Sequence, residues 1–199
     1  MSDPIADAVA AALAGGLVVL PTDTVYGVGT RPDDPAATAR LFEAKGRPRG
    51  LALPVLVASR AAAEEVAVFD DRARALAGRF WPGPLSLVLP RAERSRTWDL
   101  GEGASTVAVR MPHHPLALAV LASTGPLAVT SANRSGEPTP ATCEDLRALF
   151  GDAVDVYLCE AAPIEGSAST VVALDGSELR VLRLGAVGEV ELRAALRDA

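Results

Sequence analysis

The chain of 199 residues contains few aromatic residues, two histidines, two cysteines and a single lysine. Aromatic residues make up 4% of it, so we expect a core of Ala, Val and Leu and little stacking of nucleic-acid bases on exposed rings. The histidines, His113 and His114, are adjacent and would diverge on a helix or a strand. The cysteines, Cys143 and Cys159, are too few and too far apart for a disulfide scaffold or a thiolate zinc site. The sequence therefore predicts no metal site built from protein side chains.

The chain also lacks a hydrophobic run of membrane length. The apolar stretch at residues 8–20 could pass for the core of a signal peptide, but Asp3 and Asp7 precede it in place of basic residues. Gly15 and Gly16 interrupt it, and it is too short to span a bilayer. We interpret it as a buried helix followed by a strand, and we expect a cytoplasmic protein that does not contact membranes.

Apolar residues are plentiful, at 49% of the chain, against 22% charged residues. This balance favours a folded domain over disorder, and the length predicts one domain over residues 1–199. The formal net charge of −6 argues against a surface that binds nucleic acid all round, although it leaves room for a local basic cleft.

Helical and extended patterns alternate along the chain, which favours the α/β class. We expect helices at residues 5–13, 35–44, 61–80 (one or two helices), 116–121, from 142 onward, and 189–196. We expect extended segments at residues 17–20, 53–57, 85–89, 106–109, 127–130, 154–158, 170–174 and 179–184. These strands outnumber what simple βαβ winding needs, so we predict a mixed, twisted sheet with helices packed against it.

The first polar motif, PTDTVYG at residues 21–27, follows a predicted buried strand. Ligand sites in α/β domains gather outside strand ends, and Thr22, Asp23 and Thr24 would supply hydroxyl groups and a carboxylate there. Side chains of this kind also satisfy the backbone amides of ordinary polar turns. Taken alone, the motif favours the turn.

The second motif, KGRPRG at residues 45–50, places Lys45, Arg47 and Arg49 within five residues. It is not a Walker loop, because the chain has no G-x-x-x-x-G-K-[ST] sequence. Lysine with arginine can still neutralise the charge that develops on a leaving pyrophosphate. A solvated basic loop is the alternative. The glycines and the proline favour a shaped loop over a continued helix.

The third motif, TSANRSG at residues 130–136, follows another predicted strand. Its small residues would let a ligand approach the backbone, and Ser131, Asn133 and Arg134 could contact phosphate or ribose oxygens. An Asx-type turn is the alternative. Arg110 and Arg183 lie in or at the end of predicted strands, where an arginine can clamp a carboxylate or simply form a surface ion pair.

The order and wording of these motifs together resemble the YrdC/TsaC family. The matching stretches are PTDTVYG, KGRP, WPGPLS, TVAVRMP, TSANRSG, STVV and LRLG, from about Gly16 to Gly185, as in the single-domain form. The resemblance implies a twisted mixed sheet flanked by helices, with a deep, concave, cationic cleft. It also implies synthesis of threonylcarbamoyl-AMP from L-threonine, bicarbonate and ATP. A threonine carbamate would attack the α-phosphate and release pyrophosphate, and a separate complex would transfer the threonylcarbamoyl group to tRNA.

The resemblance also implies roles for individual residues. Catalysis would involve Lys45 and Arg47. ATP binding would involve Lys45, Arg47, Arg49, Thr106, Ser131, Asn133 and Arg183. Threonine binding would involve Thr22, Arg110 (on the carboxylate), Thr130 and Ser169. Magnesium is expected to bridge the ATP phosphates with few protein ligands. Residues 50–54 depart from the family pattern and receive no role.

Two alternatives to this synthase remain. An RNA-binding module, or a synthase with weak binding of RNA or tRNA, would use the same cationic cleft, although the acidic net charge disfavours it. A paralogue acting on another carbamoyl substrate would keep the ATP chemistry. For the main hypothesis we expect Lys45 to face solvent in the cleft, so that Lys45→Ala abolishes turnover with little loss of stability. Lys45→Arg should also be poor, because a guanidinium is not a compact ammonium.

Overall fold

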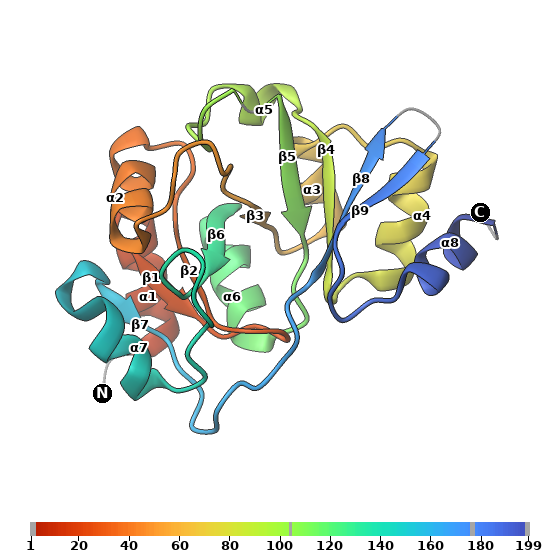
Figure 1. Cartoon of the computed structure of the whole chain (residues 1–199). Helices are drawn as coiled ribbons and strands as arrows, with labels where there is room; N and C mark the ends of the chain where they lie inside the picture. Colours follow the sequence, from red (N-terminus) through yellow and green to blue (C-terminus); the bar gives the residue numbers. More distant parts are fainter. Residues whose placement is uncertain (1–2, 104, 176–177, 198–199) are drawn as a thin grey trace.

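In the computed structural model, nine strands among the described residues join one sheet, in the order β7-β1-β2-β6-β3-β5-β4-β8-β9 (Figure 1). The structure describes residues 3–103, 105–175 and 178–197. The strands are β1 (Val18–Leu20), β2 (Gly27–Thr30), β3 (Val55–Leu56), β4 (Leu85–Pro90), β5 (Thr106–Arg110), β6 (Leu127–Ser131), β7 (Val156–Tyr157), β8 (Thr170–Asp175) and β9 (Glu178–Arg183). The pairs β1–β7, β3–β5 and β4–β8 are parallel, and the other neighbours are antiparallel. The predicted mixed sheet is confirmed.

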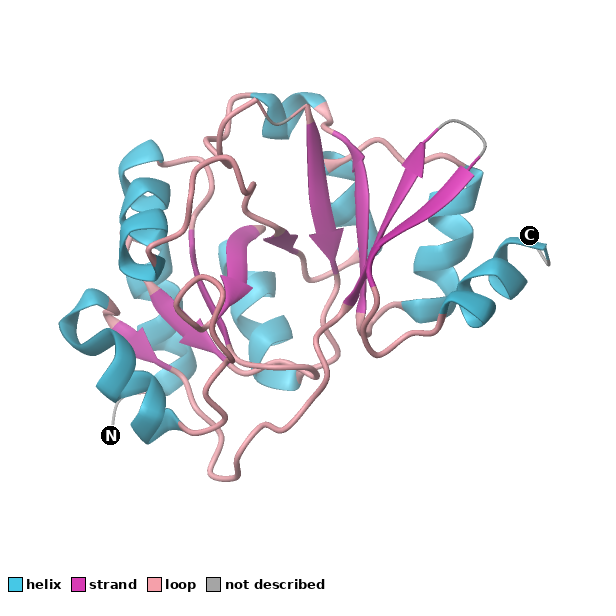
Figure 2. Cartoon of the chain, in the orientation of Figure 1, coloured by secondary structure: helices cyan, strands magenta, loops and turns pink. Residues whose placement is uncertain are grey.

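Helices flank the sheet in two groups (Figure 2). The helices are α1 (Pro4–Leu13), α2 (Pro35–Lys45), α3 (Arg60–Val66), α4 (Asp71–Phe80), α5 (Glu93–Arg96), α6 (Pro115–Thr124), α7 (Cys143–Phe150) and α8 (Glu189–Arg197). Helix α1 packs on α6 near β1 and β6, whereas α4 packs on α8 near β4, β8 and β9. Two buried apolar clusters, rich in Ala, Val and Leu, fill the space between helices and sheet.

Local capping explains where several helices begin. The side chains of Asp34, Ser59 and Asp70 accept hydrogen bonds from backbone N–H groups in the first turns of α2, α3 and α4. Thr142 likewise accepts from the Asp145 N–H at 3.2 Å at the start of α7. None of the helices in the described part of the chain has the length and apolar character needed to cross a bilayer.

One strand and one α-helix were not predicted from the sequence. Strand β2 reads Gly-Val-Gly-Thr, and glycine is depleted in strands. Glycine is nevertheless required there, because a Cβ at Gly29 would lie 2.5 Å from the Ala128 carbonyl oxygen on β6. Helix α5 has four residues, too few to show a helical period. The predicted helical region at residues 61–80 proves to be two helices, α3 and α4.

The expectation that the two cysteines are too far apart for a disulfide is wrong. Cys143 and Cys159 form a disulfide with their Cα atoms 5.8 Å apart. They are separated by 16 positions in the sequence, but the chain returns through β7 and brings Cys159 beside the first turn of α7. The Ile164 N–H also donates to the Ala141 carbonyl oxygen at 2.9 Å. The disulfide therefore ties the segment after β6 to the segment that leads into β8.

Candidate active site

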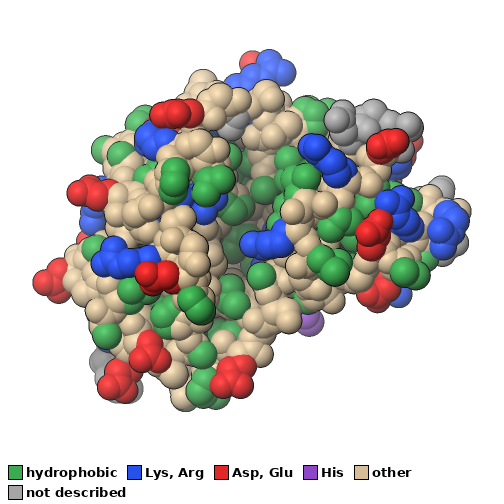
Figure 3. Space-filling view, in the orientation of Figure 1, with side chains coloured by type: hydrophobic (Ala, Val, Ile, Leu, Met, Phe, Trp, Pro, Cys, Tyr) green, Lys and Arg blue, Asp and Glu red, His purple; other side chains and the backbone are tan. Residues whose placement is uncertain are grey.

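A cavity of about 690 Å³ opens between the two helical groups, along the middle of the sheet. Figure 3 shows it as a hollow in the centre of the molecular face. Three arginines and one glutamate line it, so charged groups of positive sign predominate. The predicted site residues among its lining are Thr22, Arg47, Arg110, Thr130, Ser131, Asn133, Ser169 and Arg183. The predicted residues Lys45, Arg49 and Thr106 are not part of this lining.

The loop of residues 21–26 forms one wall, and Thr22 holds it in shape. The Thr22 hydroxyl donates to the Val25 carbonyl oxygen at 2.5 Å and accepts from the Thr24 and Val25 N–H groups. It also lies 3.0 Å from the Thr24 hydroxyl. The turn expected from the motif is therefore present, and Thr22 and Thr24 from this turn line the cavity.

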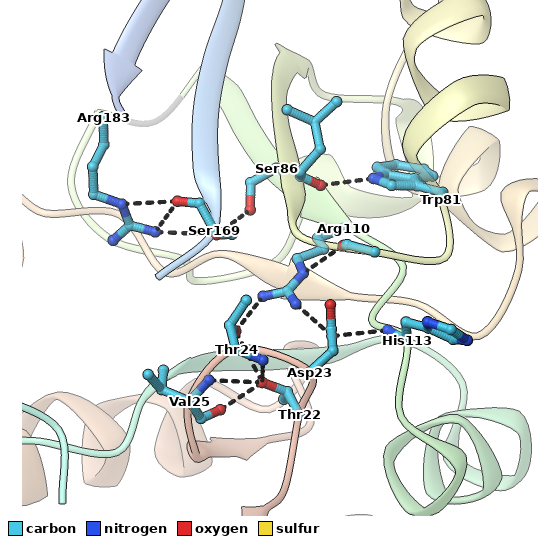
Figure 4. Close-up of polar contacts among 12 residues, drawn as sticks. Thr22, Asp23, Thr24, Val25, Trp81, Ser86, Arg110, His113, Ser169 and Arg183 are labelled. Atoms are coloured by element: carbon cyan, nitrogen blue, oxygen red, sulfur yellow. Dashed lines mark hydrogen bonds and ion pairs between the residues drawn. The ribbon is translucent and has the colours of Figure 1, made fainter. Parts of the chain in front are cut away.

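Arg110 ends β5 and is buried, with 6% of its surface exposed. Its Nε donates to the Gly83 carbonyl oxygen at 2.9 Å, Nη1 to the Thr24 hydroxyl at 3.0 Å, and Nη2 to Asp23 Oδ1 at 2.6 Å (Figure 4). Burial lowers the pKa of Arg110, and the neighbouring Asp23 carboxylate opposes that shift. Arg110 thus brings a fixed positive charge to the cavity.

A second polar group reaches the cavity from β8 and β9. The Arg183 guanidinium donates to the Ser169 carbonyl oxygen at 2.9 Å and to its hydroxyl at 3.1 Å. The Ser169 hydroxyl lies 3.1 Å from the Ser86 hydroxyl on β4. Figure 4 shows this chain of contacts on the opposite side of Arg110 from the threonines. Ser86 also lines the cavity but was not predicted, although it belongs to the WPGPLS motif that signalled the family.

The expectation that Lys45 faces solvent is wrong. Lys45 is the last residue of α2 and only 1% exposed. Its Nζ donates to the Ser131 and Asn133 carbonyl oxygens at 2.5 Å each and to Asn133 Oδ1 at 3.1 Å. Burial, and secondarily the charge of Arg47, lower its pKa to about 8. Gly46, in the left-handed conformation with φ 56°, ends the helix at this point.

Lys45 consequently shapes the turn that follows β6. The Ser131 hydroxyl donates to Asn133 Oδ1 at 2.7 Å, and Asn133 Nδ2 donates to the Glu137 carbonyl oxygen. The same amide oxygen therefore receives both Lys45 and Ser131. Three polar side chains from two motifs form one network, and Ser131 and Asn133 line the cavity above the buried ammonium.

The other residues predicted to bind ATP, Arg47, Arg49 and Thr106, have different surroundings. Arg47 lines the cavity and donates to the Leu51 and Ala52 carbonyl oxygens at 2.9 Å each, and burial lowers its pKa. Arg49 forms an ion pair with Asp99 at 2.5 Å and stacks over the Phe42 ring at 4.8 Å. Thr106 is exposed at the start of β5, opposite Pro90. Arg49 and Thr106 are thus not brought into the cavity.

The described residues contain no group of three or more His, Cys, Asp or Glu side chains that could hold a metal ion. Of the two carboxylates at or near the cavity, Asp23 is already committed to Arg110, which leaves Glu137 alone in the lining. The donor set therefore does not fit a metal site built from protein side chains, and we assign no residue to magnesium.

Fold and cavity together define an α/β protein with a cleft suited to an anionic ligand. The model of the Sua5/YciO/YrdC family, described as telomere recombination, matches residues 10–185. The chain belongs to this family.

Relatives and solved structures agree with this assignment. A Mycobacterium tuberculosis protein provisionally named threonylcarbamoyl-AMP synthase is 48% identical over 194 residues, covering 96% of this chain and 88% of that protein. The Pyrococcus abyssi Sua5 structure in complex with L-threonine is 37% identical with a TM-score of 0.90, and the match covers 96% of this chain and 56% of that one. Escherichia coli YciO is 26% identical with a TM-score of 0.85, covering 94% of this chain and 91% of that one.

Proposed function

We propose that this protein is a threonylcarbamoyl-AMP synthase, which forms threonylcarbamoyl-AMP and pyrophosphate from L-threonine, bicarbonate and ATP for threonylcarbamoyladenosine modification of tRNA. The observation that carries the proposal is the convergence of three separate motifs, around Thr22, Arg47 and Ser131, on a single cavity. The sequences of relatives named for this activity align with most of this chain. The complex of Pyrococcus abyssi Sua5 with L-threonine supports the choice of amino acid.

The proposed reaction needs charge neutralisation more than a protein nucleophile. The amino group of threonine and bicarbonate form a carbamate and release water. An oxygen of the carbamate then attacks the α-phosphorus of ATP while the bond from that phosphorus to the bridging oxygen of pyrophosphate breaks. Negative charge accumulates on the pyrophosphate as it leaves. Arg47 and Arg183 line the cavity and can stabilise that charge, because pre-positioned cations need little reorganisation during the reaction.

We assign the two reactants to two regions of the cavity. We place the threonine carboxylate at Arg110 and its remaining polar atoms near Thr22, Thr130 and Ser169. We place the nucleotide at Ser131 and Asn133, whose turn is held by Lys45. Lys45 therefore acts through that turn and through its charge below the cavity surface. Positioning of the two reactants in one cavity supplies the remaining rate enhancement.

Some parts of the proposal extend beyond the cavity. Magnesium would arrive with the ATP phosphates, and no step above depends on it. The product would pass to a separate tRNA-modifying complex, and a cytoplasmic location would suit that transfer. The RNA-binding module stays an alternative, and no specific contact among the described residues favours it.

The test is formation of AMP-containing product and pyrophosphate from ATP and bicarbonate, with and without L-threonine, with mass detection of threonylcarbamoyl-AMP. We expect threonine-dependent product in the wild type and its loss in Arg47→Ala. The matched control is Arg31→Ala, because Arg31 pairs with Asp33 at an exposed site outside the cavity lining. Product formed equally well from serine or glycine would favour another carbamoyl substrate. ATP binding without any product would contradict the synthase.

A further inference from the structure

Asp23 is the one carboxylate in the PTDTVYG motif, and it lies behind Arg110 as seen from the cavity. The Asp23 and Arg110 side chains are 15% and 7% exposed and form an ion pair at 2.6 Å. Asp23 is not among the described residues that line the cavity, whereas Arg110 and Thr24 are. The carboxylate thus contacts the guanidinium from the side away from the ligand space.

The contacts of Asp23 join three segments that are distant in sequence. Its Oδ1 accepts from Arg110 Nη2 at the end of β5 and from the His113 backbone N–H, 2.8 Å away, just before α6. Arg110 also donates to Gly83, in the turn before β4, and to Thr24. Acceptors therefore hold the guanidinium through all three of its nitrogens, and it has little freedom to rotate.

Arg110 keeps N–H groups that a ligand can use. An arginine side chain has five N–H donors, and three of them are used by Gly83, Thr24 and Asp23. The other two lie on the terminal nitrogens and have no acceptor among the described residues, so a carboxylate can accept from them in a fork geometry. A carboxylate partner behind the guanidinium also offsets the repulsion between Arg110 and the neighbouring Arg183.

We infer that Asp23 is a positioning residue for the amino-acid substrate: it fixes the Arg110 guanidinium so that its free N–H groups face the substrate carboxylate. This inference rests on the proposed function, in which Arg110 binds that carboxylate. Asp23 does not touch the substrate. Its effect should consequently appear in the use of threonine and not in the use of ATP.

The experiment compares wild type, Asp23→Asn, Arg110→Gln and the double variant. Asparagine keeps an oxygen acceptor for Arg110 and His113 but removes the charge. We expect Asp23→Asn to raise KM for L-threonine about tenfold, with KM for ATP nearly unchanged. In the Arg110→Gln background, the same replacement should change KM for threonine by less than about twofold, because it acts through the missing arginine. Asp33→Asn is the control, since Asp33 forms an exposed ion pair with Arg31.

The KM values for threonine and ATP test the positioning role of Asp23. Equal changes in both KM values, or an effect of Asp23→Asn that persists with Arg110→Gln, would overturn the positioning role. Calorimetric titration of L-threonine without ATP is run in parallel. If the wild type is active and Asp23→Asn has the same KM for L-threonine, only this inference is overturned. A wild type that neither binds nor uses threonine would overturn the proposed function as well. If Asp23→Asn does not fold, Asp23→Glu keeps the charge but displaces the carboxylate by one methylene group, and it should show the same selective rise.

Discussion

At the scale of single residues, Lys45 is the most informative side chain because its surroundings change the expected consequence of removing it. It is the single lysine of the chain, and its ammonium bonds three oxygens of the Ser131–Asn133 turn. Lys45→Ala would remove one donor from each of these oxygens and open a void beside α2. Asn133 Oδ1 would keep the Ser131 hydroxyl as a donor, and the Ser131 carbonyl oxygen would keep the Asn133 N–H. We expect a loss of about 2–4 kcal/mol in the free energy of unfolding, together with loss of turnover.

Chemical denaturation of the wild type and of Lys45→Ala measures this loss in the free energy of unfolding. Arg47→Ala is the matched comparison, because Arg47 bonds two carbonyl oxygens at the cavity wall without being fully buried. It should lose turnover while retaining most of its stability. Equal stability of Lys45→Ala and wild type would mean that the lysine bears function alone, as its sequence position had suggested.

The protonation of Lys45 gives a second residue-scale prediction. Burial and Arg47 lower its pKa from 10.5 to about 8, so the ammonium is present at neutral pH and is lost as the pH rises through about 8. Protein labelled with ¹³C only at the Cε of lysine should give one signal, whose NMR titration reports this value directly. ATP should raise the midpoint, because an anion favours the charged form. A midpoint near 10.5 in the free protein would show that the ammonium is solvated.

At the scale of elements, the disulfide couples two segments of the cavity rim. Cys143 begins α7, which follows the loop containing Glu137, Pro138 and Thr139, and Cys159 begins the segment leading to Gly166, Ala168 and Ser169. Both segments line the cavity. The segment after Cys159 packs tightly on the 21–26 loop, since a Cβ at Gly166 would lie 2.0 Å from the Thr24 carbonyl oxygen.

We expect reduction of the disulfide to lower the free energy of unfolding by about 3 kcal/mol, as for a closed loop of similar length. Thermal melting with and without dithiothreitol measures the effect. A variant with Cys143→Ser and Cys159→Ser should have the same Tm as the reduced wild type, and dithiothreitol should not change that Tm. Two free thiols in the native, unreduced protein would contradict the pairing.

The elements also show how far the sequence could predict this fold. Local sequence patterns predicted helices such as α1 and α2, because the signals of a helix lie within its own segment. Strand β2 was missed because its glycines are explained only by the close approach of β6. The same limit applies to the site: the motifs predicted Ser131 and Asn133, but the burial of Lys45 and its bonds to them depend on the contact of α2 with the turn after β6. Asp99 as the partner of Arg49 is likewise a long-range contact.

At the scale of the whole molecule, charge is distributed unevenly. The net charge is −6, yet the cavity is lined by three arginines and one glutamate. A polyanion such as ATP is therefore attracted to the cavity while most of the remaining surface does not favour nucleic acid. This distribution fits a small anionic substrate better than a long RNA backbone.

The cavity also spans the two helical groups, so its ligands should stabilise the molecule as a unit. Thr130 and Ser131 end β6 on one side, and Ser169 and Arg183 belong to the β8–β9 side. A ligand that contacts both sides binds the folded state alone, and at a hundred times its dissociation constant it should add about 2.7 kcal/mol to the free energy of unfolding. Thermal shift assays with ATP, threonine and bicarbonate, separately and together, measure this. We expect the full set to raise Tm more than ATP alone, and Arg183→Ala, which weakens one side, to reduce the gain. An equal rise with ATP alone and with the full set would mean that the amino acid does not share the cavity.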